Sequence, residues 1–189
     1  MNQKNKIEYG LKNVFFATFS VSDGVVTYAA PVAHPGAVTM TLKPDGQKTE
    51  FYADNGIYFE KSTNNGYTGS LEFAKLTDWF KQNVLGEIKD ENGVYIEDSN
   101  AAISPVAMLY QVEGDINEAL HVFYNVVPDR PGIAAGTNTE KIDPKTNTFD
   151  VAMRPASDTG YVKARTSDDT TAAIKDAWFD AVYLPQSAA

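Results

Sequence analysis

The fold is decided by the stretch Val38-Thr39-Met40-Thr41-Leu42-Lys43, in which every second side chain is apolar. A second stretch, residues 67–73, sets the apolar residues Tyr67, Leu71 and Phe73 against Thr68, Ser70 and Glu72. Successive side chains of a β-strand point to opposite faces of the sheet, so this alternation predicts strands with one face in a core and one in water.

Three later segments extend the β pattern. Residues 106–112 are apolar on both faces, as in a central strand, and two more segments each place a row of apolar residues on one side. The first row is Leu120, Val122, Tyr124 and Val126, and the second is Phe149, Val151 and Met153 beside the polar Asp150 and Arg154.

Turn signals separate several of these segments. Four dipeptides supply the positive φ angles of tight hairpin turns: Asp45-Gly46, Asn55-Gly56, Asn65-Gly66 and Asn92-Gly93. Short strands with turns between them predict an antiparallel, mainly β fold that resembles a sandwich or barrel.

One segment has a helical period instead. Within residues 76–85, Leu76, Trp79, Phe80 and Val84 recur at spacings of three and four, Thr77 or Asp78 can cap the start, and Gly86 can end it. We therefore expect one short amphipathic helix, about three turns long, beside the sheet. Residues 170–177 are a second, ambiguous helical candidate.

Length and composition indicate one soluble domain. The 189 residues suffice for one compact core, and we expect a single domain over 1–189 with a projecting arm at 44–67 and a long loop at 128–148. The formal net charge of −9 disfavours attraction to a phosphate backbone. The absence of cysteine excludes disulfides and thiolate sites. Since no apolar run is long enough to span a bilayer, we expect synthesis in the cytoplasm and no membrane contact.

The sequence gives little support to catalysis. The two histidines, His34 in a proline-flanked turn and His121 in a strand, favour structural roles, and the common hydrolase and nucleotide-binding motifs are absent. We therefore predict no enzyme activity, no catalytic, cofactor-binding or metal-binding residues, and no cofactor. Residues 90–93 and 143–150 are rich in oxygen ligands but lack the glycine of an EF-hand loop, which favours hairpin turns. The pair Asp168-Asp169 favours a helix start.

An aromatic group admits two interpretations. Tyr52, Tyr58, Phe59 and Tyr67 gather around the turns and could stack on sugars, as in a carbohydrate-binding module. Packing in the core or against another subunit is the stronger interpretation, because the neighbouring Asn64 and Asn65 are explained by a turn.

The order of short motifs along nearly the whole chain resembles the major tail protein family of siphophages and of prophages of Gram-positive bacteria. Each motif alone is a turn or an apolar strand, but the ordered set is specific. The motifs are Tyr9-Gly10-Leu11-Lys12-Asn13-Val14, Phe51-Tyr52-Ala53-Asp54-Asn55, Asn65-Gly66-Tyr67-Thr68-Gly69, Asp78-Trp79-Phe80, Val84-Leu85-Gly86 and the segment from Ala177 to Pro185.

The resemblance implies a tail-tube fold of two packed β-sheets with a flanking helix, here residues 76–85, and without the C-terminal immunoglobulin-like domain that some relatives carry. It further implies hexameric rings that stack into a tube around a tape-measure protein. Tail terminator and distal tail or baseplate proteins would be further partners. The protein would then belong to the virion tail, and DNA would pass through the lumen without specific binding.

General physical arguments are compatible with such an assembly. Edge strands of an open sheet expose unpaired backbone groups that invite association, and a head-to-tail ring leaves no edge. We expect the arm at 44–67 to contribute most to stacking, followed by the loop at 128–148 and the termini. The alternative is a β-sandwich module that binds glycans or a cell surface.

Overall fold

The computed structural model describes residues 10–113, 118–137 and 144–185. In these ranges the strands are β1 Leu11–Ser22, β2 Val25–Tyr28, β3 Val32–Ala33, β4 Ala37–Asp45, β5 Lys48–Ala53, β6 Gly56–Ser62, β7 Gly66–Phe73, β8 Ile88–Lys89, β9 Tyr95–Ile96, β10 Val106–Val112, β11 Leu120–Pro128, β12 Asn147–Arg154 and β13 Lys163–Arg165. The helices are α1 Asp78–Asn83 and α2 Ala172–Asp176.

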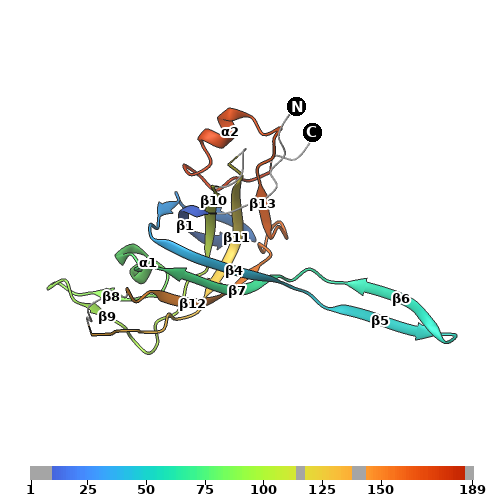
Figure 1. Ribbon diagram of the computed structural model, residues 1–189, viewed down its shortest axis with the longest axis horizontal. Coiled ribbons are helices and arrows are strands. Elements are labelled where there is room, and N and C mark those ends of the chain that lie inside the picture. Colours follow the sequence, from blue (N-terminus) through green and yellow to red (C-terminus); the bar gives the residue numbers. More distant parts are fainter. Residues whose placement is uncertain (1–9, 114–117, 138–143, 186–189) are drawn as a thin grey trace.

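Nine of these strands form one sheet in which every pairing is antiparallel. Its main path runs β2-β1-β10-β11-β12-β7-β4, while β3 pairs with β1 and β13 with β11 (Figure 1). The hairpins β5–β6 and β8–β9 are separate small sheets. The predicted mainly β class, with a short helix beside the sheet, is confirmed.

The sheet folds over on itself around a first core. Phe16 of β1 lies 6.1 Å from Phe73 of β7 between ring centroids, although three strands separate β1 from β7 in the sheet. Phe80 of α1 sits 5.0 Å from Phe16 and 5.7 Å from Phe149 of β12. The two layers expected of a sandwich are therefore two halves of one continuous sheet, and the Phe80 ring of α1 packs against both of them.

The predicted helix at 76–85 forms, but it is shorter than expected. Regular α1 has six residues, and Thr77 caps its start by accepting a hydrogen bond from the Phe80 amide at 3.3 Å. Gly86, with φ of +76°, follows the helix as predicted. Leu76, Val84 and Leu85 are buried as the period requires, yet they lie in the flanking turns.

Strand β10 is central, as its two apolar faces predict. Val106, Met108 and Tyr110 belong to the first core, whereas Ala107 and Leu109 belong to a second core on the opposite face of the sheet. Burial of both faces explains the lack of any polar–apolar alternation in residues 106–110.

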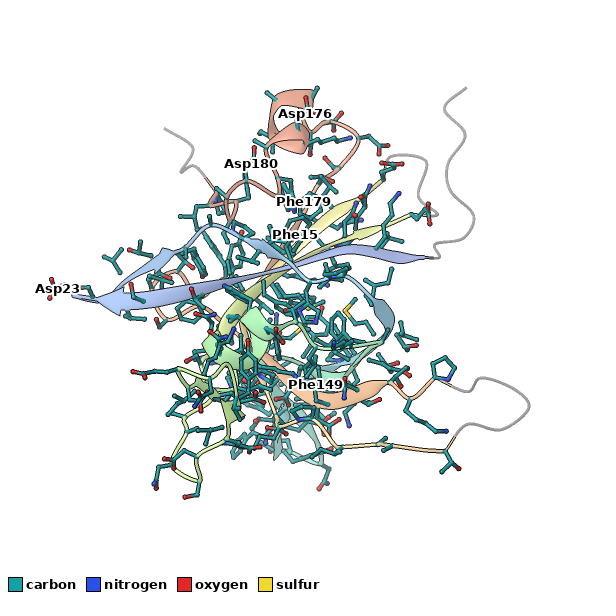
Figure 2. The ribbon with its side chains drawn as sticks, turned by 90° about the vertical axis from the view of Figure 1, so that its left-hand side faces the viewer. Phe15, Asp23, Phe149, Asp176, Phe179 and Asp180 are labelled. Carbon is teal, nitrogen blue, oxygen red and sulfur yellow. The ribbon has the colours of Figure 1, made fainter. Side chains whose placement is uncertain are left out.

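The C-terminal segment covers the second core. Trp178 is 3% exposed and donates from its indole Nε1 to the carbonyl of His121 at 3.3 Å. Phe179 stacks on Phe15 of β1 with centroids 4.6 Å apart (Figure 2). The helical candidate at 170–177 thus contains α2, but the expected role of Asp168-Asp169 at the helix start is wrong, because Thr171 is the N-cap residue.

Two apolar residues face the other way from the prediction because of β-bulges. The register between β4 and β7 shifts between Ala37 and Thr39, so Ala37 and Met40 pack on the first core while Val38 is 49% exposed. A shift in the pairing of β10 with β11 places Val126 on the first core and Tyr124 on the second. An extra residue reverses the alternation, and periodicity alone does not reveal it.

Two of the four predicted hairpin turns form. Asp54 and Asn55, with φ of 50° and 61°, make the β5–β6 turn one residue before the expected Asn55-Gly56, and Asn92-Gly93 lies in the β8–β9 turn. The turns predicted at Asp45-Gly46 and Asn65-Gly66 are wrong. Asp45 pairs with Gly66 across β4 and β7, so the two dipeptides lie side by side where the chain leaves the sheet.

The two ends of the loop at 128–148 are hydrogen-bonded to the sheet, while residues 132–137 are exposed. The Asp129 amide donates to the Asp150 carbonyl at 2.8 Å, and Thr146 donates to Glu72 at 2.6 Å. Arg130 forms an ion pair with Glu97, which ties the loop to the β8–β9 region. Residues 138–143 of this predicted excursion lie outside the described residues.

Candidate functional site

The feature that stands apart from the two cores is the hairpin β5–β6. It projects far beyond the nine-stranded sheet along the longest axis of the molecule (Figure 1). Of fourteen large apolar side chains exposed in the described residues, five belong to this hairpin: Phe51, Tyr52, Ile57, Tyr58 and Phe59. Residues 44–67, the predicted arm, therefore carry a large part of the uncovered apolar surface.

The two faces of the arm differ in chemistry. Phe51 lies directly opposite Phe59, so both rings share one face, and the pair Thr49 and Lys61 extends that face toward the base of the arm. The two phenylalanines are 59% and 53% exposed. We call these four residues the phenylalanine face.

The opposite face carries an ion-pair cluster. The Lys48 ammonium lies 2.8 Å from a Glu50 oxygen and 3.0 Å from a Glu60 oxygen, and the Tyr52 hydroxyl donates to Glu50 at 2.6 Å. The hydrogen bond from Lys48, and then that from Tyr52, lowers the pKa of Glu50. The acceptor Glu50 in turn raises the pKa of Tyr52. The arm's carboxylates at positions 50 and 60 are thus on the face opposite the phenylalanines.

The base of the arm is a narrow crossing that we call the waist, residues 45–47 and 63–66. The amide of Thr63 donates to Gln47 at 2.9 Å and that of Asn65 donates to Asp45 at 2.8 Å. Gly66 has φ of +106°, and a Cβ at this position would overlap the backbone of Met153. A glycine is needed here because the crossing backbones leave no space for a side chain.

The exposure of the arm excludes packing in the core for most of the aromatic group, and leaves open both a contact with another subunit and stacking on sugars. Packing in the core is wrong for Tyr52, Tyr58 and Phe59, which are 61%, 74% and 53% exposed. Only Tyr67 packs against the first core, where its ring meets Phe123 edge-on at 5.7 Å. The arm therefore leaves Phe51, Tyr52, Tyr58 and Phe59 open to contact with another molecule.

The nine-stranded sheet also has unpaired margins. Strands β2 and β4 end its main path, and in the described residues β4 pairs with β7 alone. The outward backbone groups of β4 can therefore pair with a strand of another chain.

Sequence reasoning did not predict that one face of the arm carries phenylalanines and the other carries charges. The signal was present in Thr49-Phe51-Ala53, where alternate positions of a strand place the phenylalanine and the charged Glu50 on different faces. It was obscured by Tyr58, the extra residue at the register shift, which interrupts the alternation of β6.

The two histidines lie in different surroundings. His34 is 1% exposed among Phe16, Phe73 and Phe80, and its Nδ1 is 3.0 Å from the Thr77 hydroxyl. Burial lowers the pKa of His34 to about 4, so the ring is neutral near pH 7. His121 stacks on Tyr110 with centroids 4.7 Å apart. Both rings are held by aromatic neighbours.

One of the two oxygen-rich segments forms the predicted hairpin turn. The other does not, because residues 147–150 belong to β12, and residue 143 lies outside the described residues. Asp90 accepts hydrogen bonds from the amides of Asn92 and Val94 at 2.9 and 2.7 Å, which makes residues 90–93 a hairpin turn as predicted. Within the described ranges, no three His, Cys, Asp or Glu side chains gather as metal ligands would. No helix among the described residues has the length and apolarity to cross a membrane.

Comparison with known proteins returned no relative: no family model matches this chain, and no curated protein is significantly similar to it.

Proposed function

We propose that this protein is a structural subunit that polymerises into the tail tube of a long-tailed bacteriophage. Copies of the chain would form hexameric rings, and the rings would stack into the tube that conducts DNA during ejection. The further partners would be a tape-measure protein, a tail terminator and distal tail or baseplate proteins. This proposal makes the protein an architectural component of the virion, without catalytic activity.

The observation that carries the proposal is the uncovered arm. Monomeric soluble proteins rarely expose contiguous apolar surface without a binding role, and the arm exposes Phe51, Ile57 and Phe59 beyond half of their area. The unpaired edge of β4 is a second surface that another chain could cover, in this case through backbone hydrogen bonds. Both features are explained when further copies of the chain cover them.

The charge of the chain is compatible with a conduit for DNA. A net charge of −9 opposes binding of phosphate to the protein surface, and sliding of DNA requires weak binding. Carboxylates that line the lumen would repel DNA within a screening length of about 8 Å at physiological salt.

The proposal is tested by the state of the purified protein as its concentration rises. Sedimentation velocity and negative-stain microscopy are expected to show rings or tubes, alone or with the tape-measure partner. A monomer at every concentration, with and without that partner, would contradict the proposal.

A shortened variant tests the role of the arm. Residues 48–62 are replaced by Asn-Gly, which closes a tight turn between Gln47 and Thr63, whose backbones are already hydrogen-bonded. The sheet is expected to keep its circular dichroism and thermal midpoint while tubes disappear. An unchanged yield of tubes would remove the arm from the assembly.

The exposed Tyr52 and Tyr58 favour one second candidate, a module that binds glycans by ring stacking. Binding of the monomer to a glycan array, abolished by Tyr52→Ala and Tyr58→Ala and insensitive to the polymeric state, would support this alternative over the tube.

A further inference from the structure

A second uncovered apolar surface lies at the end of the molecule opposite the arm. Four of the fourteen exposed large apolar residues are found there: Ile88, Val94 and Ile96 of the β8–β9 hairpin at 57%, 55% and 48%, and Ile133 of the loop after β11 at 98%. The arm and the β8–β9 hairpin lie at the two ends of the longest axis (Figure 1). Apolar exposure is thus concentrated at the two extremities.

Three of these residues form one stripe. Ile88 lies directly opposite Ile96, so the two side chains share a face, and Val94 shares it because it is two residues from Ile96. Lys89 and Tyr95 occupy the other face, where the Tyr95 hydroxyl accepts a hydrogen bond from Gln82 of α1 at 3.0 Å. Because Tyr95 anchors the hairpin to α1, the isoleucine stripe (Ile88, Val94, Ile96) faces away from the helix.

The two surfaces are complementary in charge. The phenylalanine face of the arm carries the cation Lys61, while the carboxylates of Glu50 and Glu60 point to the other face. Residues 87–98, which contain the isoleucine stripe, carry Glu87, Asp90, Glu91, Glu97 and Asp98 against Lys89, and they stay acidic although Arg130 pairs with Glu97. An apolar surface with a basic edge therefore matches an apolar surface with an acidic edge.

A hollow lies beside the β8–β9 hairpin, next to Glu87 and Glu97 that flank it, and no residue of the isoleucine stripe lines it. It has a volume of about 510 Å³ and is lined by Leu76, Leu85, Pro131 and Ile133 together with Arg130 and Glu97. Clefts of roughly 300–1,000 Å³ accept ligands that are larger than one aromatic ring. A hollow of this size can take up one aromatic ring, such as that of Tyr58, which is 74% exposed near the tip of the arm.

We infer that the phenylalanine face of one copy docks on the isoleucine stripe of a second copy, in a head-to-tail contact. This inference rests on the proposed function and names the surface that receives the arm. Donor and receiver are different surfaces at opposite ends, so the contact is heterologous and can be repeated from copy to copy. Burial of apolar area on both sides would provide its free energy.

Engineered disulfides test the inference directly, because the chain has no cysteine of its own. Ala53→Cys places a thiol on the phenylalanine face, and Val94→Cys places one on the isoleucine stripe. The control partner is Val25→Cys on β2, which is 60% exposed and belongs to neither surface. The single variants are mixed pairwise at the concentration at which the unmodified chain assembles, oxidised, and separated on a non-reducing gel.

The expected result is a cross-linked Ala53→Cys–Val94→Cys dimer at least tenfold more abundant than the Ala53→Cys–Val25→Cys dimer. Ile88→Ser with Ile96→Ser should lower the yield of assemblies at least tenfold, while Val25→Ser leaves it unchanged and all variants keep their circular dichroism.

Two outcomes would overturn the inference, and they are distinguishable. Normal assembly without preferential cross-linking to Val94→Cys would place the arm elsewhere and leave the tube proposal standing. Absence of any assembly by the unmodified chain would remove the tube proposal and this contact together.

Discussion

The first core and the arm both contain paired phenylalanines, but their surroundings are opposite. Phe73 and Phe149 stack 6.1 Å apart at 1% and 4% exposure, whereas Phe51 and Phe59 face each other across two strands with more than half of their area in water. The same residue type thus stabilises the sheet from within in one region and stays uncovered in the other.

This difference indicates that the sequence of the sheet serves the stability of the fold, whereas the sequence of the arm does not. Both faces of the sheet are covered by side chains of the same chain. Residues of α1 pack in the first core, the C-terminal segment packs in the second, and β10 contributes side chains to both. The arm adds little to the stability of the monomer because nothing packs on it. Substitutions in the two regions should therefore act on different quantities, unfolding in the sheet and association in the arm.

The largest contrast is expected from removing one ring in each region. Phe80→Ala leaves a cavity in the first core, where Phe80 is 1% exposed, and should lower the free energy of unfolding by about 3–5 kcal/mol. Phe59→Ala should change it by less than about 0.5 kcal/mol, because its ring is 53% exposed. Urea unfolding of the monomer followed by circular dichroism measures both. Equal losses would show that the arm is part of the folded core.

The next effect is a dependence of the unfolding free energy on pH, and it originates at the buried His34. His34 has a folded-state pKa of about 4, below its ordinary value of 6.5, because burial disfavours the charged ring. Between these values only the unfolded chain takes up a proton, so stability is full above pH 6.5 and falls as the pH drops toward 4. The loss should reach about 3 kcal/mol.

The control is His34→Gln, which cannot titrate in this range. Its free energy of unfolding, measured at intervals from pH 7 to pH 4, should decline less steeply than that of the unmodified chain. Parallel curves would exclude His34 as the source of the slope.

A smaller effect is expected at the waist. Gly66→Ala forces a side chain against the Met153 carbonyl at a φ of +106°, and should cost about 2 kcal/mol in unfolding free energy. Gly56→Ala at the tip of the arm meets nothing within 4 Å, and should leave the free energy unchanged or raise it slightly. Thermal unfolding of both variants gives the comparison. A much smaller loss of unfolding free energy in Gly66→Ala would mean that the backbone of the waist shifts easily to make room for the side chain.

The smallest effect should be seen on the charged face of the arm. Glu50→Ala removes the acceptor that raises the pKa of Tyr52, so that pKa should fall toward its ordinary value while the unfolding midpoint stays the same. NMR titration of labelled tyrosine measures it, with Tyr58 as the internal reference. An unchanged Tyr52 pKa would show that the hydrogen bond to Glu50 does not persist in solution.

Local patterns predicted the elements of this fold better than their connections. Alternation at 67–73 and 149–153 and the helical spacing at 76–85 predicted two strands and a helix, since each depends on one face being buried. The faces of Val38 and Val126 were wrong because a single bulge residue inverts everything beyond it.

The waist could not be predicted for a different reason. Asp45-Gly46 and Asn65-Gly66 look like turns because glycine tolerates positive φ, but glycine also allows backbones to cross closely. Only the pairing of Asp45 with Gly66, which joins residues distant in sequence, distinguishes the two uses. Likewise, the sequence predicted an arm but not that its phenylalanines share one face.

The tight waist has a mechanical consequence. Because Gly66 already touches the Met153 carbonyl, the arm cannot pivot toward β12 without breaking the pairing of Asp45 with Gly66. A sideways pull on its tip would therefore be transmitted through the waist to β4, β7 and β12, so the sheet sets the direction in which the base of the arm points.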